Sequence, residues 1–300
     1  MENIIASILL HFLSIRLPWP AASDYNGDKL FEIPFLTGSK QMAFHRFLPL
    51  VALLLSTILA SNIIAAENDW VELHKPATYK NLPYRLMSPI DLDAQQKYPV
   101  IVSLHGAGGK GNDNRKQLKD WNKQLADKQL RKDYPCYVLA PQSKGLWNET
   151  QLQQIKDIIK DLPAVDMNRI YILGHSMGGH GTFIMIQIDP SYFAAAAPSA
   201  GTGLKRTEDF IDAKVIKDIP IWTFHGDKDG VCPYGKVAEL FAEMKELGGN
   251  MKLTTWKGEN HGVSGKFIPG AENGSTQSSS DRCDQESDFM KWLFKQVKSK

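Results

Sequence analysis

Residues 169–178 have the sequence Arg-Ile-Tyr-Ile-Leu-Gly-His-Ser-Met-Gly, and this stretch decides the fold. Its apolar first half predicts a buried strand, and residues 177–188 have the spacing of a helix. Between the two lies a G-x-S-x-G pattern, in which glycines flank Ser176 because any side chain there would collide with neighbouring backbone. A strand that stops at a serine and turns directly into a helix is the geometry of a nucleophile elbow. Ser176 is therefore predicted to lie at a helix N-terminus, where free N–H groups favour a developing negative charge.

Short apolar runs alternate with amphipathic segments from Tyr98 onward, which is typical of βαβ units that build a mostly parallel sheet with helices on both faces. The expected buried strands are residues 99–104, 136–139, 170–173, 194–197, 221–224 and 251–256. The expected helices are residues 116–130, 151–161, 177–188, 236–247 and 288–298. Residues 71–73 and 84–87 are expected to pair as antiparallel strands before this core, and the serine-rich stretch 269–280 is expected to be a loop.

The composition is that of an ordinary soluble globular protein, with 43% hydrophobic and 23% charged residues. The formal net charge is only +2, and there is no basic block and no heptad repeat, so nothing points to nucleic acid or a coiled-coil partner. No Cys/His spacing resembles a zinc site, and neither a metal nor an organic cofactor is expected. The oligomeric state cannot be predicted from these features.

The segment 42–66 has the three parts of a secretory signal: a short basic region, a nearly unbroken apolar run and a small-residue cleavage site. The apolar run is shorter than the ~18 to 20 residues that a spanning helix needs, so the mature protein is expected to have no membrane span. We therefore predict a signal peptide and a secreted or periplasmic protein. An uncleaved signal would instead act as a membrane anchor.

Residues 1–41 form an N-terminal extension that is awkward for this interpretation, because a signal peptide normally begins close to the start of the chain. Either Met1 or Met42 is the initiator. In both cases the mature domain is predicted to span residues 67–300.

Three cysteines follow the predicted signal: Cys136, Cys232 and Cys283. An odd number in an exported protein permits one disulfide and one free thiol. Cys136 lies in an apolar run and is expected to be buried, whereas Cys232 and Cys283 both lie in loops expected near the active site. A bridge between these two is one alternative, and the sequence leaves it open.

A serine hydroxyl is a poor nucleophile until a base removes its proton, and the base must be oriented by a third group. Two downstream segments offer such groups, each directly after a predicted strand. Residues 224–233, Phe-His-Gly-Asp-Lys-Asp-Gly-Val-Cys-Pro, contain two aspartates, and residues 258–263, Gly-Glu-Asn-His-Gly-Val, contain one histidine. With Ser176 they give the chain order serine, aspartate, histidine.

Two aspartates compete for the acid role. Asp229 is favoured, and Asp227 is expected to bond within its own turn, as aspartates there commonly do. His261 is favoured as the base over four other histidines. His105 and His225 end strands beside glycines and are expected to be structural or to line a pocket.

His175 and His180 are the two remaining candidates. His175 neighbours Ser176 in the sequence, so its side chain is expected to point elsewhere, although it stays with His105 among the candidate substrate-binding residues. His180 is expected to be packed or solvated on the following helix.

The segment 105–109, His-Gly-Ala-Gly-Gly, follows the strand that ends at Leu104, and its glycines let backbone approach a substrate closely. One N–H from this turn, that of Ala107, is expected to join the N–H of Met177 as an oxyanion hole, worth roughly 3 to 4 kcal/mol per donor. Trp147 lies in the loop after another strand, at the edge where ligands collect. Two interpretations of Trp147 stay open: it binds substrate by stacking on a sugar or aromatic acyl group, or it covers the core.

These motifs resemble those of the α/β-hydrolase superfamily, over the chain from about Leu82 to the end. The likeness is to the group of dienelactone-hydrolase-like and phospholipase/carboxylesterase-like proteins and secreted feruloyl, acetylxylan and polyhydroxybutyrate esterases. The resemblance implies that Ser176 is the nucleophile, that Asp229 of the H-G-x-x-D turn is the acid and that His261 of the G-x-x-H-G turn is the base. Two features depart from the pattern: Gly230 stands where proline is common, and residues 269–284 look like an insertion.

The expected function is that of an exported serine esterase that works through an acyl-enzyme, with acetyl or feruloyl esters on polysaccharide as candidate substrates. The alternatives are a peptidase of the prolyl-oligopeptidase type and a non-catalytic hydrolase-like binding protein. The mature length leaves no room for the propeller domain of such a peptidase, and the complete set of three side chains argues against a binding protein.

Overall fold

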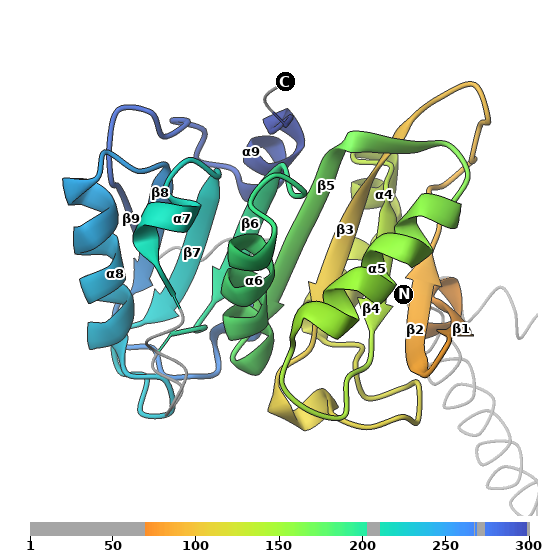
Figure 1. The fold of residues 1–300 in the computed structure, drawn as a ribbon, viewed down its shortest axis with the longest axis horizontal. Helices are drawn as coiled ribbons and strands as arrows, with labels where there is room; N and C mark the ends of the chain where they lie inside the picture. Colours follow the sequence, from red (N-terminus) through yellow and green to blue (C-terminus); the bar gives the residue numbers. More distant parts are fainter. Residues whose placement is uncertain (1–69, 203–210, 267, 269–273, 299–300) are drawn as a thin grey trace, which may run out of the picture. The chain divides into compact units, whose positions relative to one another are not determined.

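The computed structural model describes residues 70–202, 211–266, 268 and 274–298, all of which belong to one compact unit (Figure 1). The predicted signal peptide over residues 42–66 and the extension 1–41 lie outside the described residues. Of the helices in the described part of the chain, none combines the length and apolar character needed to cross a bilayer.

The described strands form one nine-stranded sheet in the order β1-β2-β4-β3-β5-β6-β7-β8-β9. Their bounds are β1 Lys75–Tyr79, β2 Leu82–Met87, β3 Tyr98–Leu104, β4 Tyr137–Pro141, β5 Val165–His175, β6 Ala195–Ser199, β7 Ile221–Gly226, β8 Met251–Trp256 and β9 Gly274–Ser278. The neighbours from β4 to β8 in this order pair in parallel, whereas the pairs β1–β2, β2–β4 and β8–β9 are antiparallel. This is the mostly parallel sheet that the alternating pattern predicts.

Helices cover both faces of the sheet, as predicted (Figure 1). Their bounds are α3 Asp120–Leu125, α4 Lys128–Asp133, α5 Glu149–Asp161, α6 Met177–Ile188, α7 Ala213–Ile216, α8 Tyr234–Glu246 and α9 Phe289–Lys295. Side chains of β3 alternate between the two layers: Val100 and Val102 pack in the core with α5, α6 and α8, whereas Ile101 packs with α3 and α9. Both faces of the central strands are therefore buried, which explains their unbroken apolar sequences.

Helix α5 shows how local sequence sets an element that borders the site. Its cap, Asn148, accepts a hydrogen bond from the Thr150 N–H, and Oε1 of Gln151 accepts the Asn148 N–H in return. The apolar stripe along α5 is buried in the core and consists of Leu152, Ile155, Ile158 and Ile159. This cap holds the loop after β4 at the carboxyl end of the sheet.

Three predicted elements are wrong. Residues 71–73 are helical, and the strand that pairs with β2 is β1. The single helix predicted over 116–130 is two short helices, because Asp127 caps α4 and so ends the helical run there. Within the predicted loop 269–280, residues 274–278 form β9, an edge strand on β8. Its polar, mostly exposed residues lack the apolar alternation that marks a strand in a sequence.

Candidate active site

Ser176 stands between the last residue of β5 and the first residue of α6, with φ 59° and ψ −122°. The neighbouring glycines are required by sterics. A Cβ on Gly174 would lie 2.5 Å from the carbonyl oxygen of Gly178, and a Cβ on Gly178 would lie 1.9 Å from that of Leu104. The predicted strand, strained turn and helix are confirmed, and the serine is held in a backbone conformation that non-glycine residues seldom adopt.

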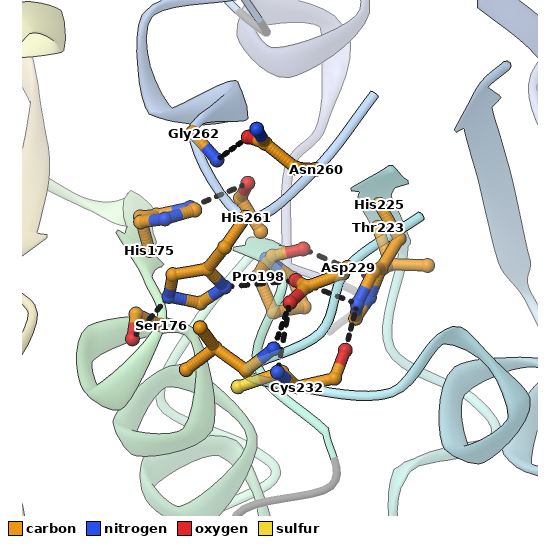
Figure 2. A network of polar contacts seen from close by, with 12 residues as sticks. His175, Ser176, Pro198, Thr223, His225, Asp229, Cys232, Asn260, His261 and Gly262 are labelled. Carbon is orange, nitrogen blue, oxygen red and sulfur yellow. Dashed lines mark hydrogen bonds and ion pairs between the residues drawn. The ribbon is translucent and has the colours of Figure 1, made fainter. Parts of the chain in front are cut away.

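Three polar side chains from different loops form a continuous hydrogen-bonded line at the carboxyl end of the sheet (Figure 2). Nε2 of His261 lies 2.9 Å from the Oγ of Ser176, and Nδ1 of His261 lies 2.8 Å from Oδ2 of Asp229. Asp229 follows β7 and His261 follows the adjacent β8, while Ser176 follows β5. The structure thus brings together the three residues predicted for catalysis. Their roles in a reaction stay a prediction.

The carboxylate of Asp229 is fully enclosed and fully satisfied. Its Oδ1 accepts hydrogen bonds from the N–H groups of Val231 and Cys232, both 2.8 Å away, and its side chain has no exposed surface. Burial raises the pKa of Asp229, but the hydrogen bonds from His261, Cys232 and Val231 outweigh burial and hold the pKa below its ordinary value. An ionised carboxylate on Nδ1 leaves Nε2 of His261 free to accept the serine proton.

His225 provides a further donor to this carboxylate. Its Nε2 lies 3.2 Å from Oδ2 of Asp229 and 2.7 Å from the carbonyl oxygen of Cys232. Both neighbours accept hydrogen bonds, so Nε2 carries the proton. Burial lowers the pKa of His225, and the ring is neutral. The sequence predicts only a structural or pocket-lining role for this histidine. The only hint in the sequence of a contact between His225 and Asp229 is their spacing of four residues. Whether residues at this spacing touch depends on the shape of the turn between them.

His175 packs against His261, a contact that the sequence did not predict. Its Nδ1 lies 3.1 Å from Oγ of Ser199, its ring is hydrogen-bonded to the main-chain carbonyl of His261, and the two imidazole rings are 4.8 Å apart (Figure 2). Burial lowers the pKa of His175 to about 3, so it adds no charge beside His261. With both polar ends engaged within the protein, His175 is placed to hold the loop of the base and not to bind substrate.

His105 and Trp147 are buried together beneath the glycine-rich loop. His105 Nε2 accepts the N–H of Ser143 at 3.0 Å, and the indole N–H of Trp147 donates to the His105 carbonyl at 3.2 Å. Trp147 is 3% exposed and packs against Gly181 of α6, where a Cβ would meet its ring at 2.3 Å. This burial agrees with the interpretation that Trp147 covers the core, and not with stacking on a substrate. Neither side chain offers a free surface to a substrate, which disagrees with a substrate-binding role for His105 and with the stacking interpretation of Trp147.

The loop after β3 passes directly over the nucleophile. A Cβ on Gly106 would lie 3.4 Å from the Cβ of Ser176. Ala107 then begins a short 3-10 turn, Ala107–Gly109. Within the described part of the chain, the N–H groups of Ala107 and Met177 have no hydrogen-bond acceptor. Both N–H groups are thus available to an oxyanion. The oxyanion hole predicted from Ala107 and Met177 stays a prediction.

Two other candidates occupy structural positions. Oδ1 of Asp227 accepts the N–H of Gly258 at 2.7 Å, so it links the loop after β7 to the loop after β8, a bond outside its own turn and contrary to expectation. His180 is 3% exposed and packed in α6, where burial lowers its pKa to about 4. Among the described residues, no group of three or more histidine, cysteine or acidic side chains is placed to hold a metal ion.

The three cysteines are free and buried, so the bridge between Cys232 and Cys283 is absent. Cys232 follows the carboxyl end of β7. Cys283 lies at the opposite edge of the sheet, where its Sγ is 3.4 Å from the carbonyl oxygen of Met251, the first residue of β8. The expectation that Cys283 lies near the active site is therefore wrong.

A mostly parallel sheet with helices on both faces, and a serine elbow at the carboxyl end of a central strand, define the α/β-hydrolase fold. Within that class the chain belongs to the dienelactone hydrolase family, whose model matches residues 140–296. The crystal structure of a thermostable esterase is similar, with 32% identity and a TM-score of 0.59 over 75% of this chain and 64% of that one.

Two curated relatives are much longer than the part that this chain matches. A bifunctional acetylxylan esterase/xylanase, XynS20E of Neocallimastix patriciarum, is 29% identical over 46% of this chain and 20% of its own length. An uncharacterized peptidase, YuxL of Bacillus subtilis (strain 168), is 22% identical over 60% of this chain and 33% of its own length. The chain thus spans about a fifth and a third of these two relatives.

Proposed function

We propose that this protein is an exported serine esterase that hydrolyses carboxylic esters through an acyl-enzyme intermediate. One observation carries the proposal: the line from Ser176 Oγ to His261 at 2.9 Å and from His261 to Asp229 at 2.8 Å. In this line the serine is bonded to the histidine and the histidine to the carboxylate, and the carboxylate on Nδ1 leaves Nε2 of His261 unprotonated. Nucleophilic acyl transfer requires both features.

In the proposed reaction, the Oγ of Ser176 bonds to the ester carbonyl carbon while His261 Nε2 takes the hydroxyl proton. The N–H groups of Ala107 and Met177 hold the resulting oxyanion. The intermediate collapses by breaking the bond to the alcohol oxygen, which receives the proton from His261. Water then attacks the acyl-enzyme in the same way and releases the acid. Asp229 stabilises the imidazolium in both steps.

We propose acetyl or feruloyl esters on polysaccharide as the substrates. Supporting this are the 32% identity to a thermostable esterase and the likeness to a protein named as an acetylxylan esterase/xylanase. Export, with a signal peptide over residues 42–66 and a mature domain over 67–300, is part of the same proposal, because a polymer substrate lies outside the cell.

The test is labelling by a fluorophosphonate probe together with hydrolysis of 4-nitrophenyl acetate. We expect both to occur with the native chain and both to be lost in Ser176→Ala, with thermal stability retained. A native chain that folds but neither reacts with the probe nor cleaves the ester is a non-catalytic hydrolase-like protein, and the proposal fails.

Peptide hydrolysis of the prolyl-oligopeptidase type is the second candidate, because the relative YuxL is named as a peptidase. The same three side chains would attack an amide. A chromogenic dipeptide anilide assayed beside 4-nitrophenyl acetate separates the two functions. We expect kcat/KM for the ester to exceed that for the anilide at least 100-fold.

A further inference from the structure

A small polar pocket of about 130 Å³ lies beside the loop that carries Ala107. Its walls come from three places near the carboxyl end of β4: Gln142 and Ser143 after the strand, the first turns of α5, and Asn81 in the turn between β1 and β2. The first turn of α5 and the β1–β2 turn both lie at the lower edge of the sheet in Figure 1. None of the three residues proposed for catalysis lines this pocket.

The lining is dominated by uncharged amides and hydroxyls. Helix α5 contributes Thr150, Gln151 and Gln154, and Lys144 is the one charged residue of the lining. Such groups both donate and accept hydrogen bonds, and none of them carries a negative charge. A ligand rich in hydroxyl groups matches this lining, because each hydroxyl can serve as donor and as acceptor.

Several of these polar atoms have no partner within the described part of the chain. Gln154 is only 6% exposed and its Nε2 donates to Oδ1 of Asn81 at 2.7 Å, which leaves Oε1 of Gln154 and Nδ2 of Asn81 unbonded. Gln154 lines the pocket, and its Oε1 is not fully enclosed by protein. Thr150 is exposed and Gln151 is half-buried, so both present polar side chains to solvent at the pocket.

The pocket wall is bonded to the loop that covers the nucleophile. The N–H of Ser143 donates to Nε2 of His105 at 3.0 Å, and Nε2 of Gln142 donates to the carbonyl oxygen of Gly109 at 3.0 Å. Between these two anchors, Gly106 lies against Ser176. The pocket and the nucleophile therefore flank one short loop.

We propose that this pocket, which we call the amide pocket, binds an uncharged, hydroxylated group: one sugar unit of a polysaccharide whose ester bond lies at Ser176. The inference rests on the proposed esterase function and adds to it the recognition of the alcohol side of the substrate. Gln154 and Thr150 are the residues that contact the sugar.

The experiment compares two acetyl esters with different alcohols: an acetylated xylo-oligosaccharide and 4-nitrophenyl acetate. Both give the same acetyl-enzyme, so the ratio of their kcat/KM values reports only on the alcohol. We expect Gln154→Leu and Thr150→Val each to lower this ratio about 3- to 10-fold, the loss expected for one hydrogen bond. Gln153→Leu is the matched control, since Gln153 bonds to Asp157 outside the pocket, and its ratio should stay within twofold.

An unchanged ratio in both pocket variants, with native melting temperatures, overturns the amide pocket and leaves the esterase function standing. If the native chain cleaves neither ester, the proposed function fails instead, and the pocket is tested by calorimetric titration with free xylotriose. Binding that weakens at least threefold in Gln154→Leu and Thr150→Val, but not in Gln153→Leu, supports the pocket. No heat of binding to the native chain overturns it.

Discussion

His225 and Asp229 are joined through the same carboxylate oxygen that faces the base. His225 Nε2 lies 3.2 Å from Oδ2 of Asp229, and His261 Nδ1 lies 2.8 Å from that oxygen. The second bond of His225, to the Cys232 carbonyl at 2.7 Å, ties the end of β7 to the loop that carries the acid. His225 therefore holds the carboxylate to which His261 is bonded, and we expect any effect of His225 on the proposed reaction to act through Asp229.

Replacing His225 tests this positioning role. His225→Leu removes the donor, and we expect kcat on 4-nitrophenyl acetate to fall about 10-fold with KM changed less than twofold, because substrate contacts are intact. His225→Gln keeps an N–H at a similar reach and should restore at least half of the lost rate. His74→Leu removes another buried histidine far from the carboxylate, and its kcat should stay within twofold. Equal losses in all three variants would show that His225 acts only through stability.

Asp229 and Asp227 are distinguished by amide substitution. Asp229→Asn removes the charge and turns an N–H toward His261 or forces its other tautomer, so we expect kcat/KM to fall by roughly 10³- to 10⁴-fold. Asp227→Asn keeps the oxygen that accepts the Gly258 N–H, and its kcat/KM should stay within about threefold. A larger loss in Asp227→Asn than in Asp229→Asn would reverse the assignment of the acid.

The space around two glycines predicts opposite effects of alanine substitution on stability: Gly178 at the elbow is crowded, and Gly235 elsewhere is not. In Gly178→Ala the new Cβ would lie 1.9 Å from backbone, so we expect a loss of more than about 3 kcal/mol in the free energy of unfolding, or no soluble protein. Gly235, near the start of α8, has nothing within 4 Å of its Cβ position, and Gly235→Ala should be neutral or stabilising by up to about 1 kcal/mol. Urea unfolding monitored by circular dichroism gives both values.

Buried histidines predict a loss of stability toward acid. Burial lowers the pKa of His74, His105 and His180 to about 4 and that of His175 to about 3. Below the unfolded pKa of ~6.5 the unfolded chain therefore binds protons that the folded chain does not. Stability should thus fall as the pH drops from ~6.5 toward 4, by up to about 1.4 kcal/mol per pH unit for each histidine.

Urea unfolding at pH 7, 6 and 5 measures this slope. His74→Asn keeps a polar group near the position of Nδ1 and removes one titrating ring. The dependence of the free energy of unfolding on pH should therefore become less steep by the contribution of one proton, up to about 1.4 kcal/mol per pH unit. A free energy of unfolding that is constant from pH 7 to pH 5 would contradict the assignment of these rings as neutral.

The absence of a disulfide predicts the behaviour of the thiols. Burial raises the pKa of Cys136 and Cys232 to about 12, and all three cysteines are enclosed. Ellman's reagent should therefore titrate three thiols in guanidinium chloride without reductant and less than one in the native protein over minutes. Only one thiol in the denatured, unreduced protein would show that a bridge forms.

Some of the site could be predicted because its constraints are local. The glycines around Ser176 are required by collisions within one turn, so the pattern of residues 174–178 specifies the elbow wherever the fold places it. Chain order then selects the two segments that carry Asp229 and His261, since each follows a buried strand whose carboxyl end must meet the same edge of the sheet. It does not separate Asp229 from Asp227, which follows the same strand.

The sequence by itself determined the parallel sheet, the elbow and the three polar residues, because periodicity and backbone sterics act over a few neighbouring residues. Only the tertiary structure decided that His175 and His225 hold the base and the acid, that Trp147 is buried and that β9 pairs with β8. These features depend on contacts between segments far apart in the chain. A side chain's burial and its hydrogen-bond partners exist only once those segments have packed together.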